Sequence, residues 1–434
     1  MSTKIAKNQV KTKKRVLMAL SGGIDSAVSA WKLIQDGYEV EAAFMKNWSS
    51  TKGLKYDECP WLVDRQDALR VAAFLGIPMH TVNYEKEYEK NVLNYFFQEY
   101  KAGRTPNPDV MCNKEIKFKM LYNWAMENGF GYVATGHYAQ VVEIKKATRA
   151  KTAPVDNFSK NEKVVGKWPS SKKASLKPAK FGADGGANEG SGFHLLRSAD
   201  DFKDQTYFIY NIRTPQLPHI LFPIGGMKKD EVKKLAKKIG LPNADKKESM
   251  GLCFVGKIRL KEFLDQKLKP KRGKIVAISA KDGGRQVTTK VIGEHEGLAY
   301  YTIGQRQGVR VGAGGPWYVA RKDLKKNELL VTNDPNDKLL ETNEVEIHSV
   351  NFITTPLSFL SKNSDGKTSK PSVKPEAKLQ ARFRHQGELV PITIQEINKD
   401  RYLVKFKKPQ QAVASGQSLV MYDGKVCVGG GVIV

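Results

Sequence analysis

The sequence has few cysteines, few acidic residues and no long hydrophobic segment. Four cysteines among 434 residues are too few for the disulfide framework of a secreted protein, so we expect reduced thiols. No uninterrupted apolar run approaches the roughly 18 to 20 residues that cross a membrane, which predicts a soluble protein with no membrane partner. Because 72 basic residues face only 45 acidic ones, the formal net charge is +27, and we expect a polyanionic partner.

The first 15 residues contain six basic residues and no acidic one. Residues 1–14 are therefore predicted to form a basic arm that contacts RNA, stays a flexible tail or directs the chain to an organelle. Together with the polar insertions described below, this arm favours a mitochondrial protein. The alternative is a protein of the bacterial cytoplasm.

Residues 15–205 alternate between strand-like and helix-like segments. Residues 38–45 and 79–83 have the composition of strands, whereas residues 64–75 and 85–101 have helical patterns. This alternation predicts a doubly wound parallel sheet covered by helices, with ligands at the carboxyl ends of the strands. Residues 144–192 are rich in lysine and poor in apolar residues, which predicts a disordered insertion.

The rest of the chain changes character twice. Residues 206–270 have a mixed pattern with one clear helix at 228–239, which predicts a small central α+β domain. Residues 271–434 consist of short alternating segments and turns, which predict a C-terminal all-β barrel. A second polar insertion, at residues 361–375, interrupts this barrel.

Residues 15–26 read RVLMALSGGIDS, an apolar strand followed by a Gly-Gly loop and the start of a helix. Unpaired backbone N–H groups and the helix dipole make such a loop an anion site. The two serines add hydroxyl donors, and Asp25 can share a divalent cation with bound phosphates. The spacing fits neither the dinucleotide fingerprint nor the Walker loop. An ordinary glycine turn is the alternative, but the loop resembles the SGGxDS loop of ATP pyrophosphatases.

Two cysteines lie in segments that suggest chemistry. Cys112 precedes Asn113, where we expect a helix to begin, and the helix N-terminus and Lys114 should lower the pKa of its thiol. Asp109, three residues earlier, is placed for proton transfer. Cys253 lies in the glycine-flanked segment SMGLCFVG. The alternative is that each is a small buried hydrophobic residue.

Taken together, the motifs resemble those of the tRNA-specific 2-thiouridylases, a family of the ATP pyrophosphatase (PP-loop) superfamily. The resemblance covers nearly the whole chain apart from the arm and the two insertions. The matching stretches, in the family's order, are SGGIDS, FMKNW, AGRTPNPDVMCNKEIKF, ATGHY, KDQTYF, GLCFVG, GEHEGLAYYTIGQRQG and the C-terminal SGQSLV and GGGVIV.

The resemblance implies an ATP-dependent tRNA sulfurtransferase that uses Mg²⁺ and replaces the C2 oxygen of the wobble uridine with sulfur. The uridine oxygen would attack ATP, giving an adenylated base and pyrophosphate. Cys253 would carry sulfur as a persulfide from a separate donor protein. Cys112 would be the nucleophile that frees this sulfur or assists its transfer, leaving a Cys112–Cys253 disulfide for a thiol to reduce. Asp109 would act as acid and base. The implied ATP contacts are Ala19, Leu20, Ser21, Gly22, Gly23, Ile24, Asp25, Ser26, Met45 and Gly136.

The resemblance also implies the tRNA contacts. Asn107, Pro108 and Asp109 would face the target base. Phe383 and His385 stand where many relatives have Tyr and Gln, so the barrel departs from the family pattern. We expect a monomer. The other implied tRNA contacts are His137, Lys203, Asp204, Gln205, Arg382, Phe383 and Gln417.

Two alternatives remain at this point. Another ATP pyrophosphatase-type ligase, acting on a small molecule, would need neither the cysteine pair nor so basic a surface. A tRNA-binding relative without catalysis would not need Ser21, Asp25, Cys112 and Cys253, all of which are present.

Overall fold

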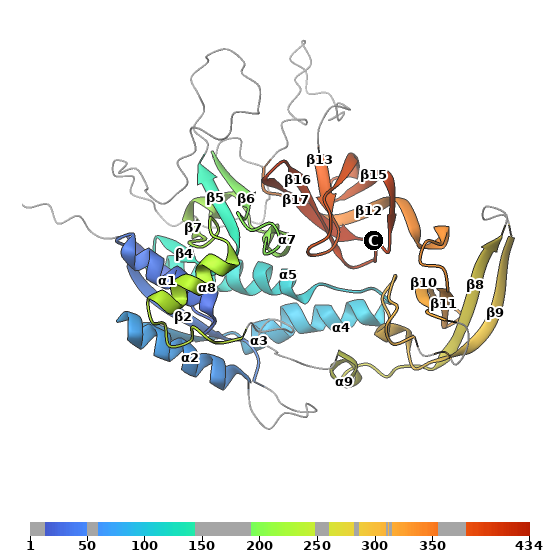
Figure 1. Cartoon of the computed structure of the whole chain (residues 1–434), viewed down its shortest axis with the longest axis horizontal. Coiled ribbons are helices and arrows are strands. Elements are labelled where there is room, and N and C mark those ends of the chain that lie inside the picture. Colours follow the sequence, from blue (N-terminus) through green and yellow to red (C-terminus); the bar gives the residue numbers. More distant parts are fainter. Residues whose placement is uncertain are drawn as a thin grey trace, which may run out of the picture.

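A computed structural model describes residues 14–49, 60–143, 192–247, 260–281, 286–309, 311, 315–354 and 379–434. Cys253, the polar insertion 361–375 and nearly all of the arm and of the insertion 144–192 lie outside these residues. Figure 1 shows a parallel-sheet domain on the left, a β-barrel at the upper right and a small sheet at the far right.

The first domain is built on a five-stranded parallel sheet, in the order β3-β2-β1-β4-β7. Strand β1 pairs in parallel with both β2 and β4, so the strand order reverses beside β1. Ligands of such sheets bind at this reversal, outside the carboxyl ends of the strands. The predicted doubly wound sheet is therefore confirmed. Its strands are β1 (Arg15–Ala19), β2 (Glu39–Lys46), β3 (Met79–Asn83), β4 (Tyr132–Ala134) and β7 (Ile220–Leu221).

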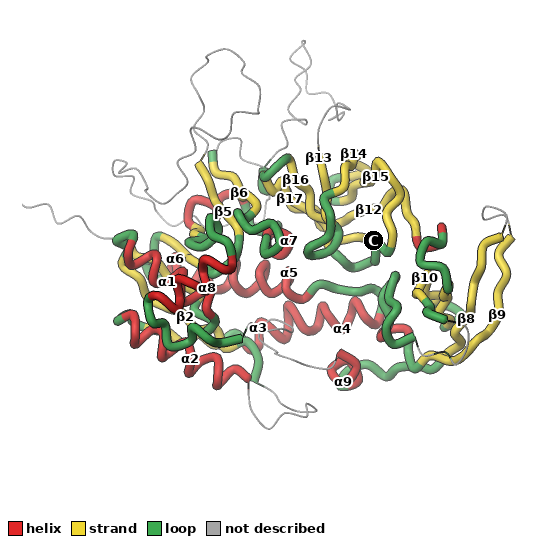
Figure 2. The backbone as a smooth tube through the Cα atoms, in the orientation of Figure 1, coloured by secondary structure: helices red, strands yellow, loops and turns green. Residues whose placement is uncertain are grey.

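Helices cover both faces of this sheet, as the tube in Figure 2 shows. Alternate residues of β2 point to opposite faces. Ala42 and Phe44 pack against α1 (Ile24–Gln35), α2 (Pro60–Leu75) and α8 (Lys229–Lys238). Ala43 and Met45 pack against two longer helical runs. The first run is α3 (Glu85–Tyr88), η1 (Glu89–Leu93) and α4 (Asn94–Lys101), and the second is α5 (Pro108–Cys112), η2 (Asn113–Leu121) and α6 (Tyr122–Glu127).

A small middle unit is present, as expected, but part of the range 206–270 packs with the first domain. Strand β7 completes the parallel sheet, and Val232 and Ala236 of α8 pack against α1. Strand β7 has only two residues, too few to show the alternation of apolar and polar residues by which a strand is predicted from sequence. The small unit after it is a four-stranded sheet, in the order β10-β11-β8-β9. Its strands are β8 (Gly273–Lys281), β9 (Gln286–His295), β10 (Tyr318–Asp323) and β11 (Glu328–Thr332).

The C-terminal strands form the predicted β-barrel. Strand β12 pairs with both β15 and β17, which closes the barrel. Leu196 of a hairpin from the first domain pairs with Val426, so the barrel sheet continues into that domain. The barrel strands are β12 (Glu341–Phe352), β13 (Leu379–Arg382), β14 (Val390–Asn398), β15 (Arg401–Gln411), β16 (Ser418–Asp423) and β17 (Val426–Ile433), and the hairpin is β5 (Ala139–Glu143) with β6 (Phe193–Arg197).

Short helices occupy the connections. They are α7 (Thr206–Ile209), η4 (Thr214–His219), α9 (Leu260–Asp265), η6 (Leu298–Tyr300) and η7 (Lys338–Leu340). No helix in the described part of the chain combines the length and apolar character of a membrane span.

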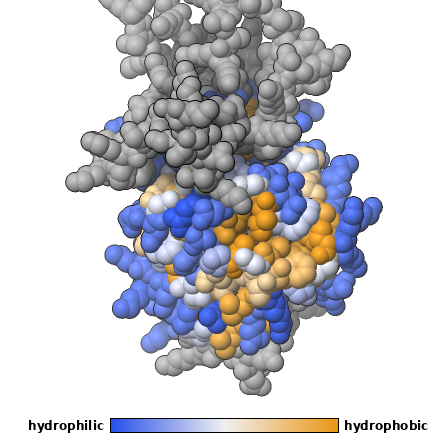
Figure 3. Space-filling model, turned by 90° about the vertical axis from the view of Figure 1, so that its left-hand side faces the viewer, coloured by the Kyte–Doolittle hydropathy of each residue, from blue (hydrophilic) through white to orange (hydrophobic). Residues whose placement is uncertain are grey.

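Apolar side chains reach the surface at the end of the molecule that carries α1 and α2, where Figure 3 shows orange patches among hydrophilic residues. Four large apolar side chains of α2 are exposed to solvent and do not pack against the sheet. They are Leu62, Val63, Leu69 and Phe74.

Candidate active site

The SGGIDS loop connects β1 to α1 at the carboxyl edge of the parallel sheet. Gly22 has a φ of +76°, and a Cβ there would lie 2.4 Å from the carbonyl oxygen of Asp64, so only glycine fits. The Ser26 hydroxyl accepts from the Ser21 backbone N–H at 3.2 Å and donates to the Gly23 carbonyl at 2.9 Å. Among the residues that the structure describes, no side chain caps α1. The loop therefore presents the N-terminal amides of α1 to an anion.

Two further predicted ATP contacts lie at the same edge of the sheet. Met45 is near the end of β2, and Gly136 follows β4. A Cβ on Gly136 would lie 2.8 Å from the Ser26 backbone nitrogen, so this segment packs directly against the start of α1. The structure thus brings the loop, Met45 and Gly136 to the ends of three neighbouring strands.

Asp25 is held by a lysine that the sequence did not reveal. The Lys229 ammonium lies 2.8 Å from both carboxylate oxygens of Asp25, and the Tyr138 hydroxyl donates to one of them at 2.9 Å. Lys229 is only 6% exposed, and its backbone N–H donates to Asp200. Lys229 is the first residue of the amphipathic helix α8. A lysine at that position is ordinary, so the sequence gives only a weak indication that it belongs to the site.

The metal-binding capacity of this edge is small. Among the residues that the structure describes, no group of three or more His, Cys, Asp or Glu side chains could hold a metal ion. Asp25 is a carboxylate at the phosphate loop, so it fits a Mg²⁺ ion carried mainly by ATP phosphates.

Cys112 lies inside a helix, which corrects one expectation. The helix begins at Pro108 and not at Asn113, because the Asn107 side chain caps it by accepting from the Val110 N–H at 3.2 Å. Asn-Pro is a typical Ncap-N1 pair. Cys112 is therefore one turn inside the helix and fully buried. The N-terminus of this helix lies at residues 107–109, so the dipole argument for a reactive Cys112 thiol does not hold.

The segment that leads to this helix is clamped by the other two units. The Thr105 N–H donates to the Ser415 carbonyl at 2.8 Å. The Gln417 amide donates to the carbonyls of Thr105, at 2.8 Å, and Pro106, at 3.3 Å. From the small sheet, the Lys322 ammonium donates to the Gly103 carbonyl at 2.9 Å. In this structure Gln417 thus positions residues 105–106.

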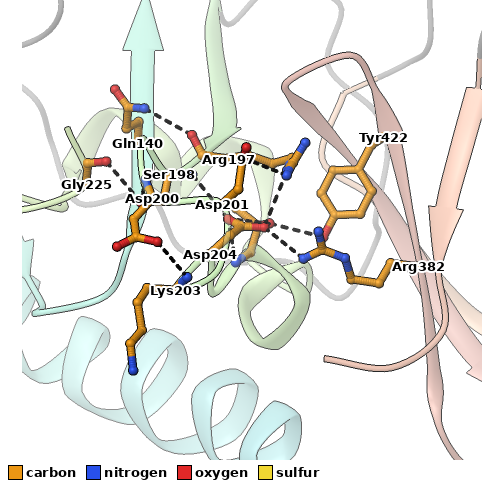
Figure 4. A network of polar contacts seen from close by, with 11 residues as sticks. Gln140, Arg197, Ser198, Asp200, Asp201, Lys203, Asp204, Gly225, Arg382 and Tyr422 are labelled. Atoms are coloured by element: carbon orange, nitrogen blue, oxygen red, sulfur yellow. Dashed lines mark hydrogen bonds and ion pairs between the residues drawn. The ribbon is translucent and has the colours of Figure 1, made fainter. Parts of the chain in front are cut away.

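Two other predicted tRNA contacts form a buried ion pair. Asp204 is fully buried, and the Arg382 guanidinium from the barrel lies 3.2 Å from its carboxylate. Thr206 donates to the same carboxylate. Figure 4 shows Arg197 and Arg382 beside Asp204, and Arg197 approaches the carboxylate at 3.6 Å. Because Asp204 has no exposed surface, it cannot touch RNA in this conformation. Its contacts join the barrel to the first domain.

The remaining predicted tRNA contacts differ in exposure. His137 and Phe383 are buried, and burial together with the nearby Lys117 holds the pKa of His137 well below its usual range. The Gln205 side chain accepts from the Tyr138 N–H. Lys203 is half-buried beside Phe202, which is 65% exposed. Phe202 and Lys203 present an aromatic ring and a charge to solvent.

A glycine-serine loop at the strand reversal of a doubly wound sheet defines the class of nucleotide-binding α/β enzymes. A family model described as the tRNA methyl transferase HUP domain matches residues 14–162 and 177–257. A tRNA methyl transferase PRC-barrel domain matches residues 261–333, and an aminomethyltransferase beta-barrel domain matches residues 349–433.

The relatives define the family more closely. The chain is 38% identical to the tRNA-specific 2-thiouridylase MnmA of Pediococcus pentosaceus, over 97% of this chain and 95% of the relative. It is also 38% identical to the enzyme of the same name from Enterococcus faecalis, over 97% and 96%. The chain belongs to the tRNA-specific 2-thiouridylase family.

Among solved structures, a 4-thiouridine synthetase–RNA complex with bound ATP gives a TM-score of 0.31 at 17% identity. It covers 58% of this chain and 50% of that one. A similarity this small has no functional weight.

Proposed function

We propose that this chain is an ATP-dependent tRNA sulfurtransferase that converts the wobble uridine to 2-thiouridine. The observation that carries the proposal is the 38% identity over 97% of the chain to a 2-thiouridylase, in a chain that has both the phosphate loop and Cys112. The matching family model is named after a methyl transferase. Methyl transfer needs neither a phosphate loop nor two cysteines, so the site favours thiolation.

In the first step, the uridine O2 attacks the α-phosphorus of ATP and pyrophosphate leaves. The amides and hydroxyls of residues 19–26 would hold the phosphates, while Met45 and Gly136 border the adenosine. Lys229 would supply positive charge beside the leaving pyrophosphate. Mg²⁺ on the phosphates, with Asp25 as a protein ligand, would offset their charge. Adenylation turns a poor leaving group at C2 into AMP.

In the second step, the terminal sulfur of a Cys253 persulfide attacks C2 and AMP leaves. The Cys112 thiolate then attacks the Cys253 sulfur. The bond between the Cys253 sulfur and the sulfur on C2 breaks, and its electron pair stays on the sulfur of the base. This yields 2-thiouridine and a Cys112–Cys253 disulfide, which a thiol reductant reopens. Asp109 would transfer the protons, and a separate protein would supply the persulfide.

Access to the reaction centre requires a movement. Cys112 has no exposed surface, so the side chains that cover it must shift before a base can reach it. The clamp on residues 103–106 lies directly before the Asn107 cap, so binding at the barrel and the small sheet can be transmitted to this helix.

The compartment and the assembly are also proposals. The compared relatives are bacterial, whereas the acid-free arm supports a mitochondrial location. A reporter fused to residues 1–16 would test the location: diffuse cytoplasmic signal would contradict it. Sedimentation of the purified chain would test the expected monomer.

The activity is tested with radiolabelled ATP, tRNA and a persulfide donor. Wild type should release pyrophosphate only with tRNA and then form 2-thiouridine. Cys112→Ser and Cys253→Ser should each abolish 2-thiouridine, while Cys253→Ser still adenylates tRNA. Cys427→Ala is the matched control, because Cys427 is buried in the barrel and its pKa is raised by burial. Substantial 2-thiouridine from either serine variant would contradict the two-cysteine mechanism.

A further inference from the structure

The phosphate loop is hydrogen-bonded to a side chain from a distant part of the chain. The Asn243 amide nitrogen donates to the Gly22 carbonyl at 2.9 Å, although the two residues are 221 positions apart. Asn243 is only 6% exposed. It belongs to the turn that follows α8, and no step of the mechanism above uses it.

The turn that carries this amide is itself fixed on two sides. Leu241 is buried in the same hydrophobic cluster as Leu20, which directly precedes the loop. The Lys246 ammonium lies 2.8 Å from the Asp64 carboxylate and 2.6 Å from that of Asp67, both on α2. The amide therefore approaches the loop from a fixed position.

The hydrogen bond sets the orientation of the peptide group between Gly22 and Gly23. The C=O and N–H of a trans peptide point in opposite directions, so a Gly22 carbonyl turned toward Asn243 leaves the Gly23 N–H turned the other way. There the N–H donates to the Ser21 hydroxyl at 3.4 Å. Ser21 is exposed, whereas Gly22 is buried, so this N–H lies on the side of the loop that an anion can reach.

Without Asn243, the opposite orientation of this peptide would become accessible. Glycine populates positive and negative φ about equally, so two successive glycines offer little resistance to a half-turn of the peptide between them. That half-turn would exchange a donor for an acceptor on the accessible side of the loop. An N–H binds a phosphate oxygen, whereas a carbonyl oxygen repels it.

We propose that Asn243 is a positioning residue for ATP, which locks the Gly22–Gly23 peptide with its N–H toward the phosphates. This inference rests on the proposed function, because it names what holds the ATP loop in its binding form. The competing interpretation is that Asn243 only ties the residues after α8 to the first domain. Loss of the contact would weaken ATP binding in the first case and would lower only the stability in the second.

The amide permits a nearly isosteric test. Among the described residues, the Asn243 amide oxygen has no partner, so Asn243→Asp alters only the contact with Gly22. A carboxylate oxygen cannot donate and repels the carbonyl. We expect the dissociation constant for ATP with Mg²⁺, measured by calorimetry on the full chain without tRNA, to rise roughly ten- to hundredfold. The KM for tRNA should stay unchanged.

Protonation of the new carboxyl group should reverse this effect. A protonated carboxyl donates through its O–H, and burial raises the pKa of a carboxyl group. Asn243→Asp should therefore regain ATP affinity relative to wild type as the pH falls from about 8 to about 5. Asn243→Leu has no donor and no proton to gain, so it should bind ATP weakly throughout this range. A purely structural role predicts wild-type ATP affinity at every pH.

Asn351→Asp is the matched control, because the Asn351 amide donates to the carbonyls of Tyr210, at 2.8 Å, and Ile212, at 3.2 Å, away from the loop. It should lower Tm and leave ATP affinity unchanged. Wild-type ATP affinity in both Asn243 variants would make Asn243 structural, and an equal loss of affinity in Asn351→Asp would show a nonspecific effect. Either result overturns the inference. A wild-type chain that binds no ATP would instead overturn the proposed function.

Discussion

At the scale of single residues, the contact between Lys229 and Asp25 is the main addition to the expected site. A lysine with 6% exposure pays the cost of desolvation only where a counter-charge is close. Here the counter-charge is the loop carboxylate at 2.8 Å. Phosphates arriving at the loop would bring further negative charge, so Lys229 is placed to neutralise both.

We expect Lys229→Met to slow tRNA-dependent pyrophosphate release by about a hundredfold, an effect typical of removing one charge-stabilising group. Lys229→Arg keeps the charge and should lose less. The double variant Asp25→Asn/Lys229→Met should be little worse than either single variant, because the two side chains act as a unit. Rapid-quench measurements would check this, and fully additive losses would contradict the coupling.

Site residues that lie in a local sequence pattern can be predicted from the sequence, whereas site residues that are brought in by tertiary contacts cannot. The loop at residues 19–26 and Gly136 were placed at strand ends because Gly-Gly loops and strand alternation are local patterns. Lys229 was missed, since α8 reaches the loop only through packing of the fold. Asp204 and Arg382 were expected to touch tRNA, but their burial depends on barrel docking, which no local pattern encodes.

At the scale of elements, the segment before α5 owes its position in part to other domains. Gly416 packs so closely that a Cβ there would lie 2.9 Å from the Thr105 carbonyl oxygen. Gln417 contacts the same carbonyl and that of Pro106. Within its own domain, Arg104 is tied to Glu99 of α4. Contacts with α4 and with the barrel therefore together set the direction in which α5 begins.

Gln417→Met should therefore reduce turnover at saturating tRNA roughly ten- to hundredfold, because small displacements of reacting groups are costly. The affinity for tRNA should change little. Gln395→Met is the matched control, since Gln395 is exposed on the barrel strand β14. Filter binding and single-turnover rates separate the two effects. Weak tRNA binding with normal turnover would assign Gln417 to a tRNA contact instead.

Lys322 gives this clamp a pH dependence. Burial lowers the pKa of Lys322 from 10.5 to about 8. Between pH 8 and 10.5 the unfolded chain binds more protons at this residue than the folded one, so the stability of the folded state rises with pH. A neutral amine still donates to the Gly103 carbonyl.

The free energy of unfolding of wild type should therefore increase relative to Lys322→Met between pH 8 and 10. Urea titrations of both proteins at several pH values would measure the difference, in which the other titrating groups cancel. A difference that stays constant, or shrinks, would show that the Lys322 ammonium is not desolvated in the folded protein.

At the scale of the whole molecule, the Asp204–Arg382 pair joins the barrel to the nucleotide domain. Replacing Asp204 by Asn would leave the Arg382 guanidinium buried without its counter-charge, which costs about 3–5 kcal/mol. Asp204→Asn should lower the free energy of unfolding by this amount and separate barrel unfolding into its own transition.

Asp201→Asn is the control: the Asp201 side chain is 81% exposed, and loss of its pair with Arg197 should cost less than about 1 kcal/mol. Equal losses would mean that burial does not strengthen the interdomain pair.

The net charge of the molecule determines how tRNA binding should respond to loss of the basic insertion. Residues 145–190 contain eleven basic and four acidic residues, so they contribute +7 of the formal +27. Their deletion leaves +20 on the rest of the chain. We expect weaker tRNA binding at low salt and a shallower dependence of affinity on salt, because fewer counterions are released. Turnover at saturating tRNA should stay close to wild type, since the loop, Cys112 and the clamp lie outside the deleted residues. A folded deletion variant without turnover would show that the insertion takes part in the chemistry.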